Sequence, residues 1–161
     1  MPTSIRAFGP EDADQLDQVA ARAFAEYDQI FGNWEQLYEE WSHMSQLSNQ
    51  GEIMVALNDE LVVGAVCYIP SGAPKPSWFE QEWGLVRSLV VDPGYRGRGI
   101  GTDLMHACIG KATEDGCHVL ALQTTPFMER AVSIYERLGF SRTKALGEAR
   151  GVEWFLYCKQ L

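Results

Sequence analysis

The sequence predicts an α/β domain (α+β in some classification schemes), in which a mixed sheet of about seven strands carries about four helices on its two faces. Short apolar runs alternate with stretches of helical period, and glycine, proline and asparagine mark the boundaries between them. The predicted strands cover residues 3–8, 52–57, 60–69, 85–91, 118–123, a run that starts at Phe140, and 152–159. The predicted helices cover residues 9–27, 33–47, 101–116 and 128–138.

The N-terminal half predicts a strand, two helices and a hairpin. Gly9-Pro10 is followed by two acidic residues, which starts a helix with negative charge in its first turn. The helix at 33–47 has apolar and aromatic residues at helical spacing, as a helix packed on a core does. Asn58-Asp59 lies between two apolar runs and predicts a tight hairpin, and residues 70–77 predict a loop within the same domain.

In the C-terminal half, two buried strands are each followed by a helix. Residues 85–91 and 118–123 are largely apolar, as strands covered on both faces are. The helix at 101–116 ends at Gly116, and its expected buried residues are Leu104, Met105, Cys108, Ile109 and Ala112. In the helix at 128–138, four residues lie on one stripe along the helix: Ala131, Ile134, Tyr135 and Leu138.

A glycine-rich turn joins the strand at 85–91 to a helix that Thr102 and Asp103 are expected to open. Its three glycines let the backbone approach a ligand closely and let successive N–H groups point at one anion. The helix N-terminus favours negative charge, and two arginines between the glycines add charge-assisted donors. The turn therefore predicts a site for a diphosphate, which consists of Arg96, Gly97, Arg98, Gly99, Ile100, Gly101 and Thr102.

Two other phosphate-binding patterns do not fit this turn. A dinucleotide fingerprint G-x-G-x-x-G that starts at Gly97 requires a third glycine where Thr102 stands. A Walker A loop requires Ser or Thr after its Gly-Lys pair, and Gly110-Lys111 is followed by Ala112. The pattern that remains is R-x-x-G-x-G, formed by Arg96, Gly99 and Gly101.

This pattern, with VVDP before it and a helix after it, resembles the coenzyme A pyrophosphate loop of the GCN5-related N-acetyltransferases. Residues 131–140 resemble a second signature of that family, A-x-x-x-Y-x-x-x-G-F, at about the distance from the loop that the family shows. The two motifs, in the family's order, span residues 85–140 and carry the resemblance.

The resemblance implies a three-layer fold whose mostly antiparallel sheet splays between its fourth and fifth strands, residues 85–91 and 118–123. It implies that the pantetheine arm of acetyl-CoA enters this gap as an added strand. The residues expected to contact the cofactor are Leu89, Val90, Val91, Arg96, Gly97, Arg98, Gly99, Ile100, Gly101, Thr102 and Tyr135. The family's acceptor site is walled by the segment that corresponds to residues 27–47, so its aromatic residues belong to the core or to a pocket. The four candidates are Tyr27, Phe31, Trp34 and Tyr38.

For catalysis, the resemblance assigns Tyr135 as the general acid that protonates the departing thiolate. A backbone N–H near Val90 or Val91 is expected to stabilise the developing oxyanion. An alkyl ammonium with a pKa of about 10.4 must lose a proton near pH 7, which costs about 4 to 5 kcal/mol and requires a carboxylate or a water chain. Glu82 is the candidate base. It lies about one residue from the position of the base in several relatives, where Trp83 stands, and solvation at the surface is its alternative role.

One position departs from the family pattern. Many relatives carry Asn three residues before the alanine of the second signature, in contact with the cofactor arm, and Met128 stands there. Thr124, Thr125 and Pro126 lie just upstream, so this polar contact has either moved to them or been lost.

The composition of the chain limits which classes of partner it can have. The length of 161 residues and the hydrophobic content of 46% are those of a single domain, residues 1–161. With 13 basic against 22 acidic residues, the net charge of -9 argues against nucleic acid. Neither a membrane span nor a secretory signal is expected. Four cysteines without C-x-x-C or zinc-like spacing favour reduced thiols in a cytoplasmic protein and no metal centre.

Two functions from different classes fit these observations. The first is an N-acetyltransferase that moves the acetyl group of acetyl-CoA to a primary amine of a small molecule or a protein. The second is a non-catalytic CoA-binding sensor or regulatory module of the same fold. The sequence does not identify the amine, and relatives of this family are often homodimers.

Overall fold

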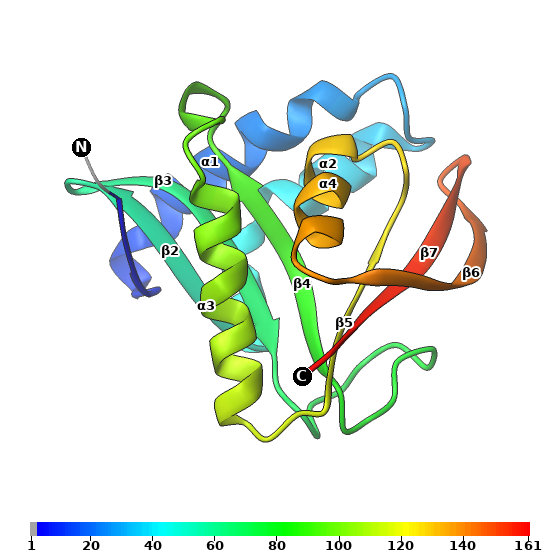
Figure 1. Cartoon of the computed structure of the whole chain (residues 1–161). Coiled ribbons are helices and arrows are strands. Elements are labelled where there is room, and N and C mark those ends of the chain that lie inside the picture. The colour runs from blue at the N-terminus through cyan, green and yellow to red at the C-terminus, as the bar shows by residue number, and fades with distance from the viewer. Residues whose placement is uncertain (1–2) are drawn as a thin grey trace.

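A computed structural model describes residues 3–161 of the chain, and Figure 1 shows its arrangement. The strands are β1 (Ser4–Ala7), β2 (Glu52–Asn58), β3 (Leu61–Ile69), β4 (Gly84–Val91), β5 (Val119–Thr124), β6 (Ser141–Ala149) and β7 (Val152–Gln160). The α-helices are α1 (Ala13–Phe24), α2 (Trp34–Ser42), α3 (Ile100–Glu114) and α4 (Glu129–Arg137). Short 3₁₀ turns are η1 (Pro10–Asp12), η2 (Ala25–Tyr27), η3 (Met44–Asn49) and η4 (Pro93–Tyr95). The seven strands and the four helical regions predicted from the sequence are therefore confirmed.

The helix predicted at 33–47 is wrong in its length, because it breaks at His43. The α-helix ends at Ser42, and a 3₁₀ turn continues from Met44. Asp17 of α1 accepts hydrogen bonds from the backbone N–H of Ser45 at 2.8 Å and from its hydroxyl at 2.9 Å. These bonds draw the chain toward α1, so a tertiary contact overrides the helical pattern.

The start predicted for the helix after the glycine-rich turn is also wrong, because α3 begins at Ile100 and not at Thr102. Gly99 is the N-cap residue with a φ of +81°, and its carbonyl accepts the N–H of Asp103 at 3.0 Å. A left-handed glycine turns the chain directly into the helix, and buried Ile100 anchors the first turn.

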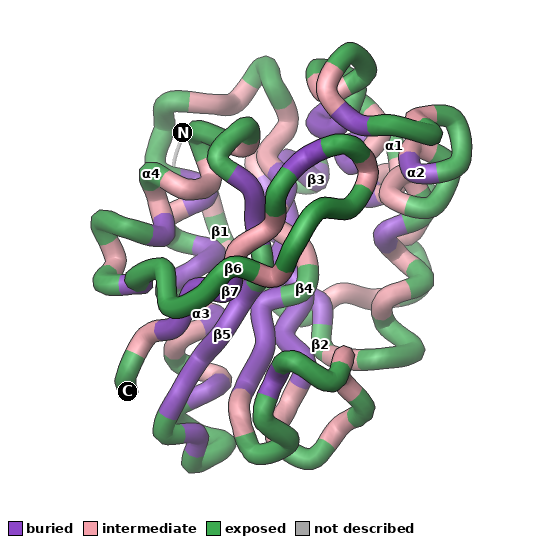
Figure 2. The backbone as a smooth tube through the Cα atoms, turned by 90° about the vertical axis from the view of Figure 1, so that its right-hand side faces the viewer, coloured by how far each residue is buried: buried purple, intermediate pink, exposed green. Residues whose placement is uncertain are grey.

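The sheet separates two hydrophobic cores, with α1 and α2 on one face and α3 and α4 on the other (Figure 1). Leu16 and Val19 of α1 pack into the first core, and Leu104 and Met105 of α3 pack into the second. Figure 2 shows that the strands in the middle of the sheet are buried, whereas β6 at its edge is largely exposed. The expected arrangement of helices on both faces is confirmed.

The sheet is split where the sequence resemblance implied. Its order is β1-β2-β3-β4-β5-β7-β6, and β4 and β5 are the one parallel pair of neighbours among the described strands. They pair only at Gly84 with Leu120 and at Leu85 with Ala121. Beyond these residues the two strands diverge, as Figure 1 shows, so the sheet opens into a V under α4.

A close approach at Gly64 of β3 holds α3 against the sheet beside this opening. A Cβ atom on Gly64 would lie 2.9 Å from the backbone oxygen of Val90, and 3.2 Å and 3.3 Å from side-chain carbons of Leu104 and Ile100. Because interiors are close-packed, the missing Cβ lets the first turns of α3 lie directly over the end of β4.

We predict that Gly64→Ala destabilises the protein by about 1 to 3 kcal/mol, because the added methyl group forces β4 or α3 to move. Thermal unfolding should register a lower melting temperature, by roughly 2 to 4 °C per kcal/mol for a chain of this size. The control is Gly110→Ala on the exposed side of α3, where a Cβ atom meets nothing within 4 Å. That variant should gain up to about 1 kcal/mol. An unchanged melting temperature for Gly64→Ala would refute the close approach.

Candidate active site

A cavity of about 570 Å³, called here the cradle cavity, lies between α3, α4 and the C-terminal end of β4. Its walls combine three residues of β4, the glycine-rich turn, the first turn of α3 and one face of α4. The residues predicted from the sequence that line it are Leu89, Val90, Val91, Arg96, Gly97, Gly99, Ile100, Gly101 and Thr102. A strand edge, a nest of amides and a helix N-terminus therefore face one space.

The edge of β4 that faces this cavity offers unpaired peptide groups. Asp92 donates its N–H to the carbonyl of Val63 at 2.8 Å, and the carbonyl of Val90 faces Gly64, so both peptides point toward β3. Because successive residues of an extended strand direct their peptide groups to opposite sides, Leu89 and Val91 direct theirs toward the gap with β5. Between Val90 and Val91, Val91 therefore has the N–H that reaches the gap.

The glycine-rich turn is fixed by Asp92 at its start. One carboxylate oxygen accepts the N–H of Gly94 at 2.9 Å, and the other accepts a guanidinium hydrogen of Arg22 at 2.6 Å. Burial works to raise the pKa of Asp92, but these hydrogen bonds together hold it below its ordinary value. Gly97 and Gly99 then adopt φ values of +78° and +81°, with nothing within 4 Å of the place of a Cβ atom. Their backbone faces open space, as an anion cradle requires.

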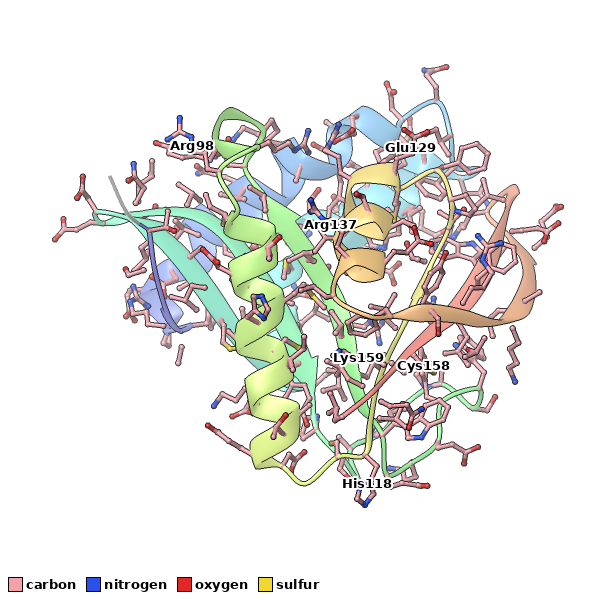
Figure 3. All side chains as sticks on the ribbon, viewed as in Figure 1. Arg98, His118, Glu129, Arg137, Cys158 and Lys159 are labelled. Carbon is pink, nitrogen blue, oxygen red and sulfur yellow. The ribbon has the colours of Figure 1, made fainter. Side chains whose placement is uncertain are left out.

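Three arginines surround the cradle cavity, and two of them share one carboxylate. Arg96 donates to Glu26 at 2.6 Å, and Arg130 of α4 pairs with the other oxygen of the same carboxylate. Arg137 lies two turns further along α4, on the side that faces α3 in Figure 3, and lines the cavity without an ion pair to any described residue. Arg98 does not line it: its guanidinium lies 4.8 Å over the ring of Tyr95, on the outer side of the turn (Figure 3).

A second cavity of about 360 Å³, called here the acceptor cavity, adjoins the first. The two share Phe24, Tyr27, Leu89 and Ala131 in their walls. Tyr135 lines the acceptor cavity and not the cradle cavity. The strand gap therefore has on one side a cavity whose wall holds three arginines and Glu129, and on the other side a phenol.

The hydroxyl of Tyr135 is neither hydrogen-bonded to a described residue nor sealed from solvent. The residue is buried, its hydroxyl bonds to no described group, and it is not among the polar atoms sealed away from solvent. Tyr135 therefore lines the acceptor cavity with a hydroxyl that has no hydrogen-bond partner among the described residues. Burial raises the pKa of this phenol, so it stays protonated at neutral pH.

The candidate base and the residues considered for a polar cofactor contact lie in different places. Glu82 lies in the exposed turn before β4 and lines neither cavity. Met128 and Thr124 both line the acceptor cavity, and the Thr124 hydroxyl reaches the Met128 sulfur at 3.8 Å. Thr125 is fully buried and its hydroxyl bonds to no described group.

Of the four aromatic residues considered for a pocket wall, Tyr27 lines both cavities, and Phe31, Trp34 and Tyr38 line neither. Phe31 instead packs at the centre of an aromatic cluster, 5.4 Å from the ring of Trp41 and 5.8 Å from the ring of Trp154. Two of these rings, Trp41 and Trp154, line the acceptor cavity.

Several lining residues escaped the sequence analysis. Arg130 and Arg137 lie seven residues apart with Ile134 between them, which is a signal for one helix face. The sequence does suggest Arg87, as a local positive charge for the anionic cofactor, but Arg87 lines the acceptor cavity and not the cradle cavity. It lies at a bulge of β4, where Cys67 pairs with Ser88 and Tyr68 with Val86, so it has no partner on β3. Trp154, which lines the acceptor cavity, and Glu26, which pairs with two arginines of the cradle cavity, carry no comparable signal, since distant segments bring them to the site.

Within residues 3–161, no group of three or more His, Cys, Asp or Glu side chains is arranged to hold a metal ion. All four cysteines are buried and free. In the described part of the chain, no helix has both the length and the apolar content that crossing a bilayer requires.

Residues 13–140 match the model of the acetyltransferase (GNAT) family. An uncharacterized N-acetyltransferase of Methanocaldococcus jannaschii is 26% identical over 148 residues, which are 89% of this chain and 62% of that protein. N-alpha-acetyltransferase MAK3 of Arabidopsis thaliana is 40% identical over 63 residues, which are 39% of this chain and 33% of that protein. This chain thus spans less than two thirds of the length of either relative.

The fold agrees with the family match. The crystal structure of the PaiA N-acetyltransferase from Thermoplasma acidophilum, a complex with coenzyme A, superposes with a TM-score of 0.75 at 19% identity, over 100% of both chains. The family match covers most of the chain, and it includes the glycine-rich turn and the Tyr135 helix. The chain belongs to the acetyltransferase (GNAT) family.

Proposed function

We propose that the protein transfers the acetyl group of acetyl-CoA to a primary amine, with Tyr135 as general acid. The observation that carries this proposal is the pair of adjoining cavities, one lined by the glycine-rich turn, a helix N-terminus and three arginines, and the other lined by the phenol of Tyr135. The PaiA protein of the same fold was crystallised with coenzyme A, which supports the choice of donor. Acetyl-CoA would supply the activated acyl group.

The residues of the cradle cavity fit an elongated anionic donor. The amides from Gly97 to Thr102 and the dipole of α3 would hold the diphosphate, and Arg96, Arg130 and Arg137 would add positive charge. Since the chain carries a net charge of -9, this local positive charge must attract the anion against the global field. The unpaired edge of β4 would hold the pantetheine amides.

Two groups of the chain would then act on the reacting atoms. The N–H of Val91 faces the gap and would stabilise negative charge on the carbonyl oxygen. Tyr135 would donate its proton to the departing sulfur, and burial keeps that proton in place at neutral pH.

The base is the least defined part of this proposal. The acceptor cavity contains no carboxylate or histidine side chain in its wall, and Glu82 is exposed outside it. Glu82 stays a prediction, and water in the acceptor cavity is the simpler route for the amine proton. This lack of a base also keeps the non-catalytic CoA sensor as a second candidate.

The two candidates separate in one experiment. The acetyltransferase releases free CoA from acetyl-CoA in the presence of an amine, whereas the sensor binds CoA tightly and releases none with any amine. The single-domain extent, the homodimer and the cytoplasmic location stay predictions.

We predict that Tyr135→Phe lowers kcat by about 10²- to 10⁴-fold, because the departing thiolate loses its proton donor. CoA affinity, measured by calorimetry, should stay within a small factor because the cradle cavity is untouched. The control is Tyr157→Phe, which removes a buried phenol that accepts from Arg142 and lines neither cavity. Unchanged turnover in Tyr135→Phe would assign the proton to water instead.

We predict that Gly99→Val abolishes measurable CoA binding, because its side chain would occupy the space that the backbone offers to the diphosphate. The control is Gly116→Val. Gly116 follows the end of α3, has a φ of +77° and an equally open Cβ position, but lies outside both cavities. Both variants place valine at a similar positive φ, so calorimetry should find a loss of affinity only for Gly99→Val. Equal affinities in the two variants would place the diphosphate elsewhere.

A further inference from the structure

We propose that the acceptor is an α-amine next to a bulky apolar side chain, and that a tryptophan groove binds this side chain. The tryptophan groove is formed by Trp41, Trp78 and Trp154. The inference rests on the proposed acetyl transfer and names the class of its second substrate.

The position of the acceptor follows from the two cavities. The attacking nitrogen must reach the strand gap from the side opposite the donor, which is the acceptor cavity with Tyr135 in its wall. A third cavity of about 250 Å³ adjoins the acceptor cavity. The side chains that line both are Trp41, Trp78, Gln123 and Trp154, so the two cavities meet along them.

The charges around this space disfavour a polycationic substrate. Neither cavity has Asp or Glu in its wall, although the chain has 22 acidic residues. The charged side chains that do line them are Arg87 and Arg150, and neither forms an ion pair with a described residue. An ammonium group would enter without a counter-ion and meet like charge. Amines that are neutral near physiological pH are therefore favoured.

The wall of the acceptor cavity also lacks a base, which likewise favours amines that are neutral near physiological pH. At pH 7.5, roughly a third of an α-amino group with a pKa near 7.8 is neutral, against about one in a thousand for a lysine-type amine with a pKa of 10.4. A site without a carboxylate to take the proton gains most from the first kind of amine. The acceptor nitrogen is therefore assigned as an α-amine.

The groove beside the amine is built to receive an apolar group. The indole N–H of Trp78 donates to Gln123 at 2.9 Å, and that of Trp154 donates to the carbonyl of Ala149 at 2.9 Å. With both polar edges occupied, the rings offer their apolar faces to the cavities. Trp78 packs against Phe79, with ring centroids 6.1 Å apart, and is still 40% exposed, so it forms the solvent-facing rim of the groove.

The rings of the groove are also held in place without a ligand. Trp41 packs against Phe24 at 4.9 Å and against Phe31 at 5.4 Å, and Phe31 stacks on Trp154 at 5.8 Å. A pre-formed aromatic wall binds an apolar side chain at low entropic cost. The side chain beside the α-amine would therefore be bulky and apolar, such as that of phenylalanine or leucine.

The N-terminus of a peptide supplies this chemistry in full. A free amino acid is the second source, but its own carboxylate raises the pKa of its amine, so a smaller fraction of it is neutral at pH 7.5. Arg87, at the bulge of β4, would pair with the carboxylate of the free amino acid or with the first carbonyl of the peptide. The experiment distinguishes them with phenylalanine, phenylalaninamide and a short peptide that begins with phenylalanine.

The test measures release of free CoA from acetyl-CoA by the full chain at pH 7.5, with these three compounds, glycinamide, Nα-acetyl-lysinamide and spermidine. We expect kcat/KM for phenylalaninamide to exceed that for glycinamide by at least about tenfold. It should exceed that for Nα-acetyl-lysinamide by about a hundredfold or more, in line with the neutral fractions. A preference for free phenylalanine or for the peptide identifies the source.

A variant pair tests the groove itself. Trp78→Ala should reduce the preference for phenylalaninamide over glycinamide by about tenfold, because the rim loses its apolar face. Phe127→Ala removes another exposed aromatic ring that lines none of the three cavities, and it should leave this preference unchanged.

The outcomes separate this inference from the proposed function. Highest turnover with spermidine or Nα-acetyl-lysinamide would overturn the inference and leave acetyl transfer intact. An unaltered preference in Trp78→Ala would overturn the role of the groove. No CoA release with any amine, together with tight CoA binding by calorimetry, would overturn both and favour the sensor.

Discussion

The parting of β4 from β5 after two paired residues is the constraint on which the rest of the structure depends. Beyond Leu85, the peptide groups of β4 on that side have no strand partner among the described residues. Unpaired N–H and C=O groups are costly in a protein interior and invite an added strand. The cradle cavity lies along this open edge and the acceptor cavity adjoins it, so the split sheet brings the two proposed substrates to the same point.

The surrounding elements keep the gap open and polarised. Gly64 lets α3 lie close over the end of β4, and at Gly101 a Cβ atom would meet Ile134 of α4 at 2.8 Å. The two helices thus approach each other at the mouth of the gap while the sheet separates below them. Glu26 joins the glycine-rich turn to α4 through Arg96 and Arg130. An anionic ligand would compete with the Glu26 carboxylate for both arginines. The ion pairs that connect the turn to α4 therefore also reduce the positive charge of the cradle cavity.

The fold and the glycine-rich turn could be predicted from the sequence because their determinants are local. Left-handed glycines, a buried strand and a helix start are adjacent at residues 85–101, and the Tyr135 stripe is complete within one helix. The break at His43 could not be predicted, because it depends on hydrogen bonds from Ser45 to Asp17. The acceptor cavity could not be predicted either, because its three tryptophans are far apart in the sequence. Trp41 comes from a helix, Trp78 from a loop and Trp154 from the last strand. Arg98 shows the converse, since it lies within the predicted diphosphate turn while its side chain stacks on Tyr95.

The central claim is that the open edge of β4 receives the cofactor arm as a strand, and amide hydrogen exchange of the 15N-labelled protein with and without CoA tests it most directly. Leu89 and Val91 direct their N–H groups to the gap, whereas that of Val90 already points to β3 and serves as an internal reference. The account predicts that CoA slows exchange at Leu89 and Val91 by about tenfold or more, with a smaller change at Val90. Saturating CoA that leaves Leu89 and Val91 exchanging at their free rates would contradict it.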